Sequence, residues 1–200
     1  MINVQLDGHP DATLPTKSAR KIVTYWACRF GSVSCLSQAN AELKILMRSN
    51  GKKKILSEVY CAGLRASTKT EYEFFWKRLS KSSDEPSRNV LLNALACTAN
   101  EIWLNEYLSS SLNSTNLKGF AYRSDEQSHI FKAVYQSGPI GFKHALAYLT
   151  AHIEEAHMSY RSLSDIVTGM AEHVVSDELA NSVRCLITFF SIFIALIFSL

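Results

Sequence analysis

The chain is poor in the residues that interrupt helices. Its 200 residues include only four prolines and eight glycines, and stretches that alternate apolar and polar residues are hard to find. These absences disfavour β folds, which need alternation within strands and turn residues between them. The 47% hydrophobic content excludes a disordered tail and suits one domain or a short run of helical repeats.

A strong excess of positive charge is also missing. The net charge is +3, and lysines and arginines are scattered apart from Lys52–Lys54. That triplet follows a polar turn and opens a helical pattern, so it is expected to be solvated. We therefore expect no nucleic-acid partner.

No familiar catalytic motif is present. The sequence has no His-Glu-x-x-His zinc motif, no Gly-x-Ser-x-Gly elbow and no Gly-rich phosphate loop. His152 and His157 lie five residues apart instead of four, and Ile153 stands where a zincin has its general base. Glu154 and Glu155 are neighbours that point about 100° apart on a helix, so they cannot flank one bond. We expect no catalytic residue, metal ligand or cofactor in this chain.

What the sequence does contain is helical periodicity. Apolar residues recur at spacings of three and four, and Thr68 with Glu71 and Ser124 with Gln127 form capping-box patterns. The expected helices cover about residues 17–30, 34–48, 53–66, 69–81, 86–98, 100–110, 125–137, 140–157 and 162–175, with a last one from about 177.

These expected helices form consecutive pairs. Related segments ending in Cys28, Cys61 and Cys97 close the first helices of three pairs, 33 and 36 residues apart. The period indicates an all-α fold of stacked antiparallel helix pairs, a solenoid of the HEAT or armadillo type. A plain helical bundle is the alternative, because three loose matches do not prove a repeat.

The cysteines and the two ends of the chain allow fewer conclusions. Five cysteines are an odd number without a Cys-x-x-Cys pair, and from spacing alone they could be ordinary buried thiols. Asn113 opens an N-glycosylation sequon. Residues 1–8 show no signal-peptide pattern, whereas Leu186–Leu200 contains neither charge nor proline.

Four motifs carry a family resemblance. They are Val59-Tyr60-Cys61-Ala62-Gly63, Glu73-Phe74-Phe75-Trp76, Asn93-Ala94-Leu95-Ala96-Cys97-Thr98 and Trp103-Leu104-Asn105-Glu106-Tyr107-Leu108. This series resembles the C-terminal helical domain of the M1 zinc aminopeptidases, the family of aminopeptidase N, over about residues 15–180. In that family the domain begins well before the equivalent of Met1, so the resemblance implies a partial domain.

The resemblance also implies covalent features. The family has a close and a wide cysteine pair, and the same spacings here imply disulfides Cys28–Cys35 and Cys61–Cys97. Disulfides belong to an extracellular domain, which adds weight to glycosylation of Asn113. The expected organisation is an irregular segment 1–14, a helical domain 15–183 and a hydrophobic tail 184–200.

The same resemblance also implies a function for the chain. In the family this domain forms a bowl over the zinc site, limits entry to peptides with free N-termini and contacts the distal part of the peptide. The implied partners are the catalytic domain of an aminopeptidase and its peptide substrate, and zinc belongs to the full-length family. The alternative is a stand-alone membrane-tethered helical-repeat binding protein derived from an aminopeptidase.

The tail is expected to hold the protein on the extracellular face of the plasma membrane. Fifteen residues as a helix span about 22 Å, short of the roughly 30 Å hydrocarbon core, whereas a GPI signal needs about 10–20 apolar residues. The small residues Ala180, Asn181 and Ser182 are attachment candidates. Only three residues separate them from the apolar run, so a short membrane-inserted helix with Arg184 at the interface is the alternative.

Overall fold

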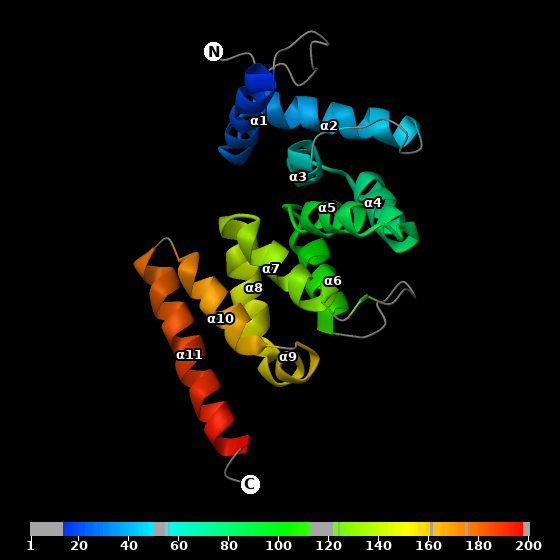
Figure 1. The fold of residues 1–200 in the computed structure, drawn as a ribbon. Coiled ribbons are helices and arrows are strands. Elements are labelled where there is room, and N and C mark those ends of the chain that lie inside the picture. Colours follow the sequence, from blue (N-terminus) through cyan, green and yellow to red (C-terminus); the bar gives the residue numbers. More distant parts are fainter. Residues whose placement is uncertain are drawn as a thin grey trace. The chain divides into compact units, whose positions relative to one another are not determined.

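All regular structure in the described residues of the computed structural model is α-helical (Figure 1). The structure describes residues 14–49, 55, 57–112, 122–123, 125–160, 162–174 and 176–197. The helices are α1 (Leu14–Arg29), α2 (Val33–Arg48), α3 (Ser57–Arg65), α4 (Lys69–Lys81), α5 (Glu85–Leu95), α6 (Glu101–Leu112), α7 (Glu126–Gln136), α8 (Pro139–Ala151), α9 (Ile153–Ser159), α10 (Leu163–Glu172) and α11 (Asp177–Ile197). The expected all-α class is confirmed.

The chain divides into two compact units, Met1–Ala99 and Asn100–Leu200. In the first unit α3 packs against α1, α2 and α5, and α4 packs against α2 and α5. Its largest fully buried side chains are Leu43, Leu46, Leu64, Tyr72, Phe75, Leu79, Leu92 and Leu95. The apolar stripe of α4 expected from the sequence therefore faces this core.

Local capping marks the starts of α4 and α5 in the first unit. The Thr68 backbone N–H donates to the Glu71 carboxylate at 2.6 Å, which is the backbone half of the predicted capping box. Asp84 accepts from the Ser87 backbone N–H at 2.9 Å before α5. The Glu71 carboxylate also accepts from Asn40 on α2, so the cap is tied to the packing of α2 on α4.

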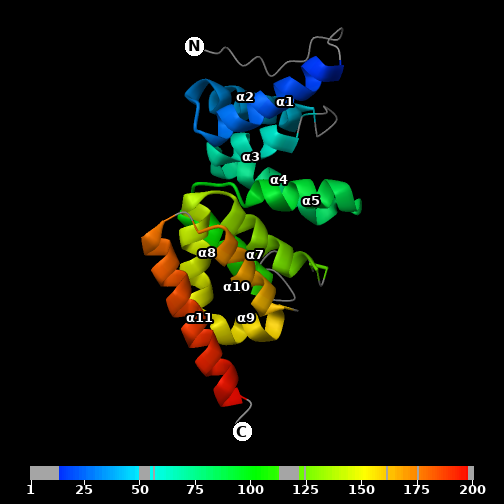
Figure 2. The ribbon, with the colours of Figure 1, turned by 60° about the vertical axis from the view of Figure 1, so that its left-hand side comes forward.

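In the second unit α6, α7 and α8 pack on one another, α9 packs against α6 and α8, and α10 packs against α7 and α11. Figures 1 and 2 both show α10 lying beside α7 and α11. The largest fully buried side chains of this unit are Leu104, Tyr107, Leu108 and Phe131.

Three consecutive serines at the end of α6 each accept a hydrogen bond from a tyrosine. Tyr148 of α8 donates to Ser109 at 3.1 Å. Ser110 and Ser111 donate to main-chain carbonyls one turn earlier on α6. Each has only one hydroxyl proton, so the tyrosine must be the donor in the Tyr122–Ser110 pair at 3.0 Å and the Tyr160–Ser111 pair at 2.6 Å.

The predicted single helix over residues 140–157 is wrong. The chain leaves helical geometry at His152, with φ −126° and ψ 34°, and α9 begins after this break. Tertiary packing explains the break, because it allows Ala156 and Tyr160 to be buried and Ser159 to reach the Leu112 carbonyl at the end of α6.

The start of α7 also differs from the expectation. Asp125, and not Ser124, is its N-cap, and the Glu126 carboxylate accepts from the Arg123 backbone N–H at 2.9 Å. The carboxylate of Glu126, one position before the expected Gln127, therefore accepts from a backbone N–H that precedes the helix. Ser124 itself lies outside the described residues.

Helix α11 continues through the expected boundary between residues 183 and 184. Leu179, Val183 and Leu186 are buried, at the spacing of one helical face. Within the described residues, none of the helices combines the length and apolarity that crossing a membrane requires.

Candidate binding groove between α7 and α10

A polar groove of about 580 Å³ runs between α7 and α10 in the second unit. Each helix turns its apolar face inward, with Phe131 and Val134 on α7 and Ile166 and Met170 on α10. The polar residues of both helices remain along the open side at helical spacing. Those lining the groove are Asp125, Ser128, His129, Lys132, Tyr135, Gln136, Ser162, Asp165, Thr168, Glu172 and His173.

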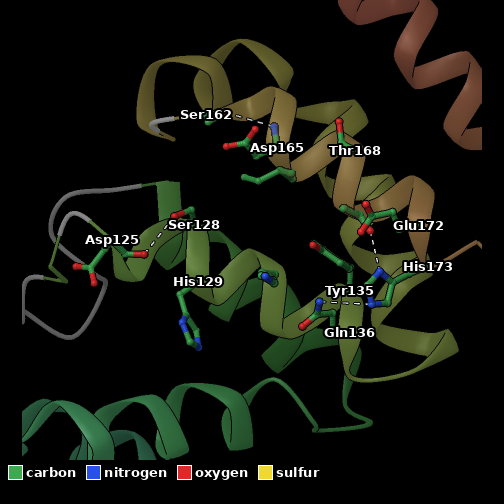
Figure 3. Close-up of a pocket in the computed structure, with 13 residues that line it drawn as sticks. Asp125, Ser128, His129, Tyr135, Gln136, Ser162, Asp165, Thr168, Glu172 and His173 are labelled. Carbon is green, nitrogen blue, oxygen red and sulfur yellow. Dashed lines mark hydrogen bonds between the residues drawn. The ribbon is translucent and has the colours of Figure 1, made fainter.

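The groove has two ends of different chemistry. Asp125, Ser128, Ser162 and Asp165 lie toward one end, whereas Tyr135, Gln136, Glu172 and His173 gather at the other (Figure 3). At the first end the Ser162 hydroxyl accepts from the Asp165 backbone N–H at 3.3 Å and caps α10.

His173 is held in one orientation at the second end. Its Nδ1 lies 2.8 Å from the Gly169 carbonyl oxygen, which can only accept, so Nδ1 carries the proton. Its Nε2 is 3.4 Å from the Gln136 side-chain nitrogen and is then the acceptor. The Tyr135 ring packs edge-on against the imidazole, with ring centroids 5.4 Å apart.

Gly169 allows the tyrosine to approach α10. A Cβ at this position would overlap the Tyr135 hydroxyl, so a larger residue would push the ring away from α10. The glycine therefore leaves the space that the Tyr135 hydroxyl occupies against α10.

Burial shifts the pKa of two groups in the groove. It raises the pKa of the Tyr135 hydroxyl, and the nearby Glu172 carboxylate acts in the same direction. It also lowers the pKa of His129, an effect that Lys132 strengthens and that Asp125 and Glu126 oppose. Near neutral pH the Tyr135 hydroxyl is therefore a hydrogen-bond donor and not a nucleophile.

The lining has more negative than positive charge. The lining contains three carboxylates, those of Asp125, Asp165 and Glu172, and one lysine, Lys132. The other polar groups of the lining include hydroxyls and an amide. Such a surface can accept hydrogen bonds from N–H groups and attract cationic side chains. The lining therefore offers hydrogen-bonding and charged groups with which a polar ligand could be held.

The structure contains both disulfides that the resemblance implied. Cys28 is bonded to Cys35, and Cys61 to Cys97, each with Cα atoms 5.2 Å apart. The first joins α1 to α2, and the second joins α3 to the turn that follows α5. Cys185 is free and exposed on α11.

The other predicted site residues lie on α11 or outside the described part. Asn113 belongs to residues 113–121, which the structure does not describe. Ala180, Asn181 and Ser182 lie in the first half of α11, and the Ser182 hydroxyl donates to the Glu178 carbonyl within that helix.

The described residues do not fit a zinc ion. They contain no group of three or more His, Cys, Asp or Glu side chains that could hold a metal. His152 lies at the break between α8 and α9, with Nδ1 3.0 Å from the Glu155 carboxylate. His152 and His157 thus do not lie one turn apart on the same helical face, as the two histidines of a zinc motif must.

A search of protein families gives one match that covers nearly the whole chain. The ERAP1-like C-terminal domain matches residues 5–187. The chain belongs to this family. Because the family is the C-terminal domain of the M1 aminopeptidases, the resemblance seen in the cysteine and tryptophan motifs is confirmed.

Curated members of this family are much longer than the chain. Aminopeptidase N of Plutella xylostella is 25% identical over 171 residues, which are 82% of this chain and 18% of that protein. The thyrotropin-releasing hormone-degrading ectoenzyme of Homo sapiens is 29% identical over 106 residues, 52% of this chain and 10% of that protein. The chain thus spans less than a fifth of either relative.

Sequence reasoning did not find the groove in this family member. Its residues recur at helical spacing on two segments, residues 125–136 and 162–173, and this is also the pattern of a solvated helix face. A usable signal was Gly169, a glycine inside a helical pattern, because such a glycine often marks a close approach of two elements.

Proposed function

We propose that this chain is the non-catalytic C-terminal helical portion of a membrane-bound M1 zinc aminopeptidase, which removes N-terminal residues from peptides. The observation that carries the proposal is the family match over residues 5–187. The chain has no His-Glu-x-x-His motif, so zinc and the catalytic groups would come from the parent's catalytic domain. This portion would shape and cap the cavity that holds the peptide.

The packing of the first unit supports a repeat architecture for the parent's domain. The first helices of successive pairs contact one another, α1 with α3 and α3 with α5, while the second helices α2 and α4 contact each other. Stacked helix pairs have this pattern of neighbours. A stack can be extended by further pairs, which suits a wall around a cavity.

The groove between α7 and α10 is the surface we assign to the peptide. Its carboxylates and hydroxyls would accept from backbone N–H groups and attract lysine or arginine side chains of the peptide's distal part. Asp165→Asn with Glu172→Gln in the parent enzyme should raise KM for a long basic peptide and leave kcat unchanged, since these groups bind and do not react. A dipeptide substrate, too short to reach the groove, is the matched control, and equal changes for both substrates would refute the assignment.

Two features support an extracellular location at the plasma membrane. The two disulfides are typical of oxidising compartments, and the human relative is by name an ectoenzyme. We assign the attachment to the tail 184–200, through GPI near Ala180–Ser182 or through a short inserted helix.

The transcript decides between the proposed function and the alternative of a stand-alone binding protein. Full-length cDNA should extend upstream of Met1 in the same reading frame and encode His-Glu-x-x-His with a downstream glutamate ligand. A mature transcript whose 5′ end lies just before Met1, translated from that codon, would instead establish the stand-alone protein.

A further inference from the structure

Helices α4 and α5 border a basic pocket in the first unit, which we call the α4–α5 pocket. Its volume is about 480 Å³, and it lies where the two helices pack side by side (Figure 2). The residues that line it are Phe74, Lys77, Arg78, Lys81, Ser82 and Ser87. The described lining thus has three cationic side chains, an aromatic ring and two serines, and it contains no carboxylate.

The cations are crowded on one side of α4. Lys77 and Arg78 each lie within one helical turn of Lys81, and like charges at these spacings destabilise a helix. The same helix has the favourable arrangement elsewhere, since Lys69 pairs with Glu73 four residues later at 3.8 Å. A local arrangement that costs stability is typical of a functional surface, and this one suits an anion.

The described part of the chain does not neutralise the two lysines of the pocket. Neither Lys77 nor Lys81 forms an ion pair with another described residue. Asp84, three residues after Lys81, accepts from the Ser87 backbone N–H at 2.9 Å and is not part of the lining. The helix dipole favours cations in the last turn of α4, which holds Arg78 and Lys81 but not Lys77. The positive potential of the pocket is therefore available to a ligand.

A smaller and more apolar pocket adjoins the basic one. Its volume is about 280 Å³, and it shares Arg78 and Ser87 with the α4–α5 pocket. The rest of its lining consists of Ile55, Tyr60, Pro86, Val90 and Leu91. The two pockets thus form one surface with a cationic end and an apolar end, and Arg78 belongs to both.

The walls of both pockets are held in place by buried groups. The Arg88 side chain, in a residue that is 6% exposed, donates to the Ser82 carbonyl at 2.8 Å and fixes the turn between α4 and α5. The Tyr60 and Phe74 rings each pack edge-on against the buried Phe75 ring, with centroids 5.7 Å and 5.2 Å from it. Walls that are already ordered lose little conformational entropy when a ligand binds.

We propose that the α4–α5 pocket binds an acidic peptide segment of a partner protein, in which carboxylates directly precede a large apolar side chain. The carboxylates lie against Lys77, Arg78 and Lys81, and the apolar side chain enters the adjoining pocket. A sulfated polysaccharide would use the cations alone, so the apolar end of the surface favours a peptide. The inference concerns the first unit by itself and does not depend on the proposed function.

Fluorescence anisotropy with a labelled peptide tests the proposal on the 200-residue chain. The probe contains Asp-Glu-Leu-Phe between glycines, with a neutral fluorophore at its N-terminus and an amide at its C-terminus, so that only its two carboxylates are charged. Its affinity should fall as NaCl is added, because salt screens exposed charges. Control peptides with Asn-Gln in place of Asp-Glu, or Gly-Gly in place of Leu-Phe, should each bind about fivefold more weakly.

Variants locate the binding site. Lys77→Gln with Lys81→Gln should weaken binding of the probe about fivefold, because two exposed ion pairs are lost. Lys69→Gln with Lys143→Gln removes the same net charge outside the pocket and should leave the affinity unchanged. Val90→Ser, in the adjoining pocket, should weaken binding of the probe but not of the Gly-Gly peptide. All four lysines are exposed, so the lysine variants should fold, which circular dichroism checks.

Four outcomes would overturn the proposal. The first is no binding of the probe up to about 1 mM, the weak end of measurable affinity. The second is equal weakening by the two lysine double variants, which would show that only net charge matters. The third is equal binding of the probe and the Gly-Gly peptide, which would show that the apolar end is not used. The fourth is a heparin octasaccharide that binds through Lys77 and Lys81 and displaces the probe while its own affinity far exceeds that of the probe, since the pocket would then be a polysaccharide site.

Discussion

Replacing Ser111 by alanine should destabilise the second unit more than its small size suggests. The Ser111 hydroxyl is fully buried at the end of α6, and the Tyr160 hydroxyl donates to it at 2.6 Å. Tyr160 is itself buried, with its ring 5.6 Å from that of Phe131. In Ser111→Ala the Tyr160 O–H loses this acceptor, and a buried donor without an acceptor costs about 1–3 kcal/mol.

The reverse substitution should cost less. Tyr160→Phe keeps the ring in its packing, and Ser111 still donates to the Leu108 carbonyl at 2.6 Å. Only one acceptor position of a serine is lost, so we expect about 0.5–1.5 kcal/mol. The double variant should cost less than the sum of the two, because the orphaned donor of Ser111→Ala is then absent.

Urea unfolding followed by circular dichroism measures these differences with the disulfides intact. Ser80→Ala is the matched control, since the Ser80 hydroxyl donates to the carbonyl three residues earlier on α4 but is exposed. It should stay within about 0.5 kcal/mol of the unchanged chain. The reasoning is refuted if Ser111→Ala costs no more than Ser80→Ala, or if the single effects simply add.

Four further predictions concern pH, covalent links, activity and anchoring. Burial raises the pKa of Tyr160 above its value near 10 in the unfolded chain. The stability that depends on a neutral Tyr160 is therefore fully present below pH 10 and is lost as the pH rises further. Tyr160→Phe should flatten this alkaline fall in the urea midpoints. On the loop-entropy model, removing the Cys61–Cys97 disulfide should lower the free energy of unfolding by about 4 kcal/mol and removing Cys28–Cys35 by about 2 kcal/mol, because the sequence separations are 36 and 7. Paired Cys→Ser variants measure these losses, and equal losses for the two pairs would contradict the prediction. Expressed alone, the chain should hold no stoichiometric zinc and should not hydrolyse aminoacyl substrates; turnover that a chelator abolishes, in a preparation free of host peptidases, would contradict this. With a signal peptide and a reporter placed before residue 1, phosphatidylinositol-specific phospholipase C should release the chain from cells; retention with residues 186–200 still detectable by mass spectrometry would favour the inserted helix.

The sequence by itself determined the class of the fold and most of its helices. Local rules act over three or four residues, so the Thr68–Glu71 pattern and the apolar stripe of α4 could be recognised without any tertiary information. The family and the two cysteine pairs were also visible, because motifs and spacings survive in the linear sequence.

Only the tertiary structure decided what depends on contacts between distant segments. The break at His152 follows from burying Ala156 and Tyr160 against other helices, and no local sequence pattern within one helical turn of His152 predicts it. The serine–tyrosine pairs join residues up to 49 positions apart. The α7–α10 groove and the α4–α5 pocket are likewise defined by which faces find a neighbour, because a helical stripe in sequence shows that a face is apolar or polar but not what covers it.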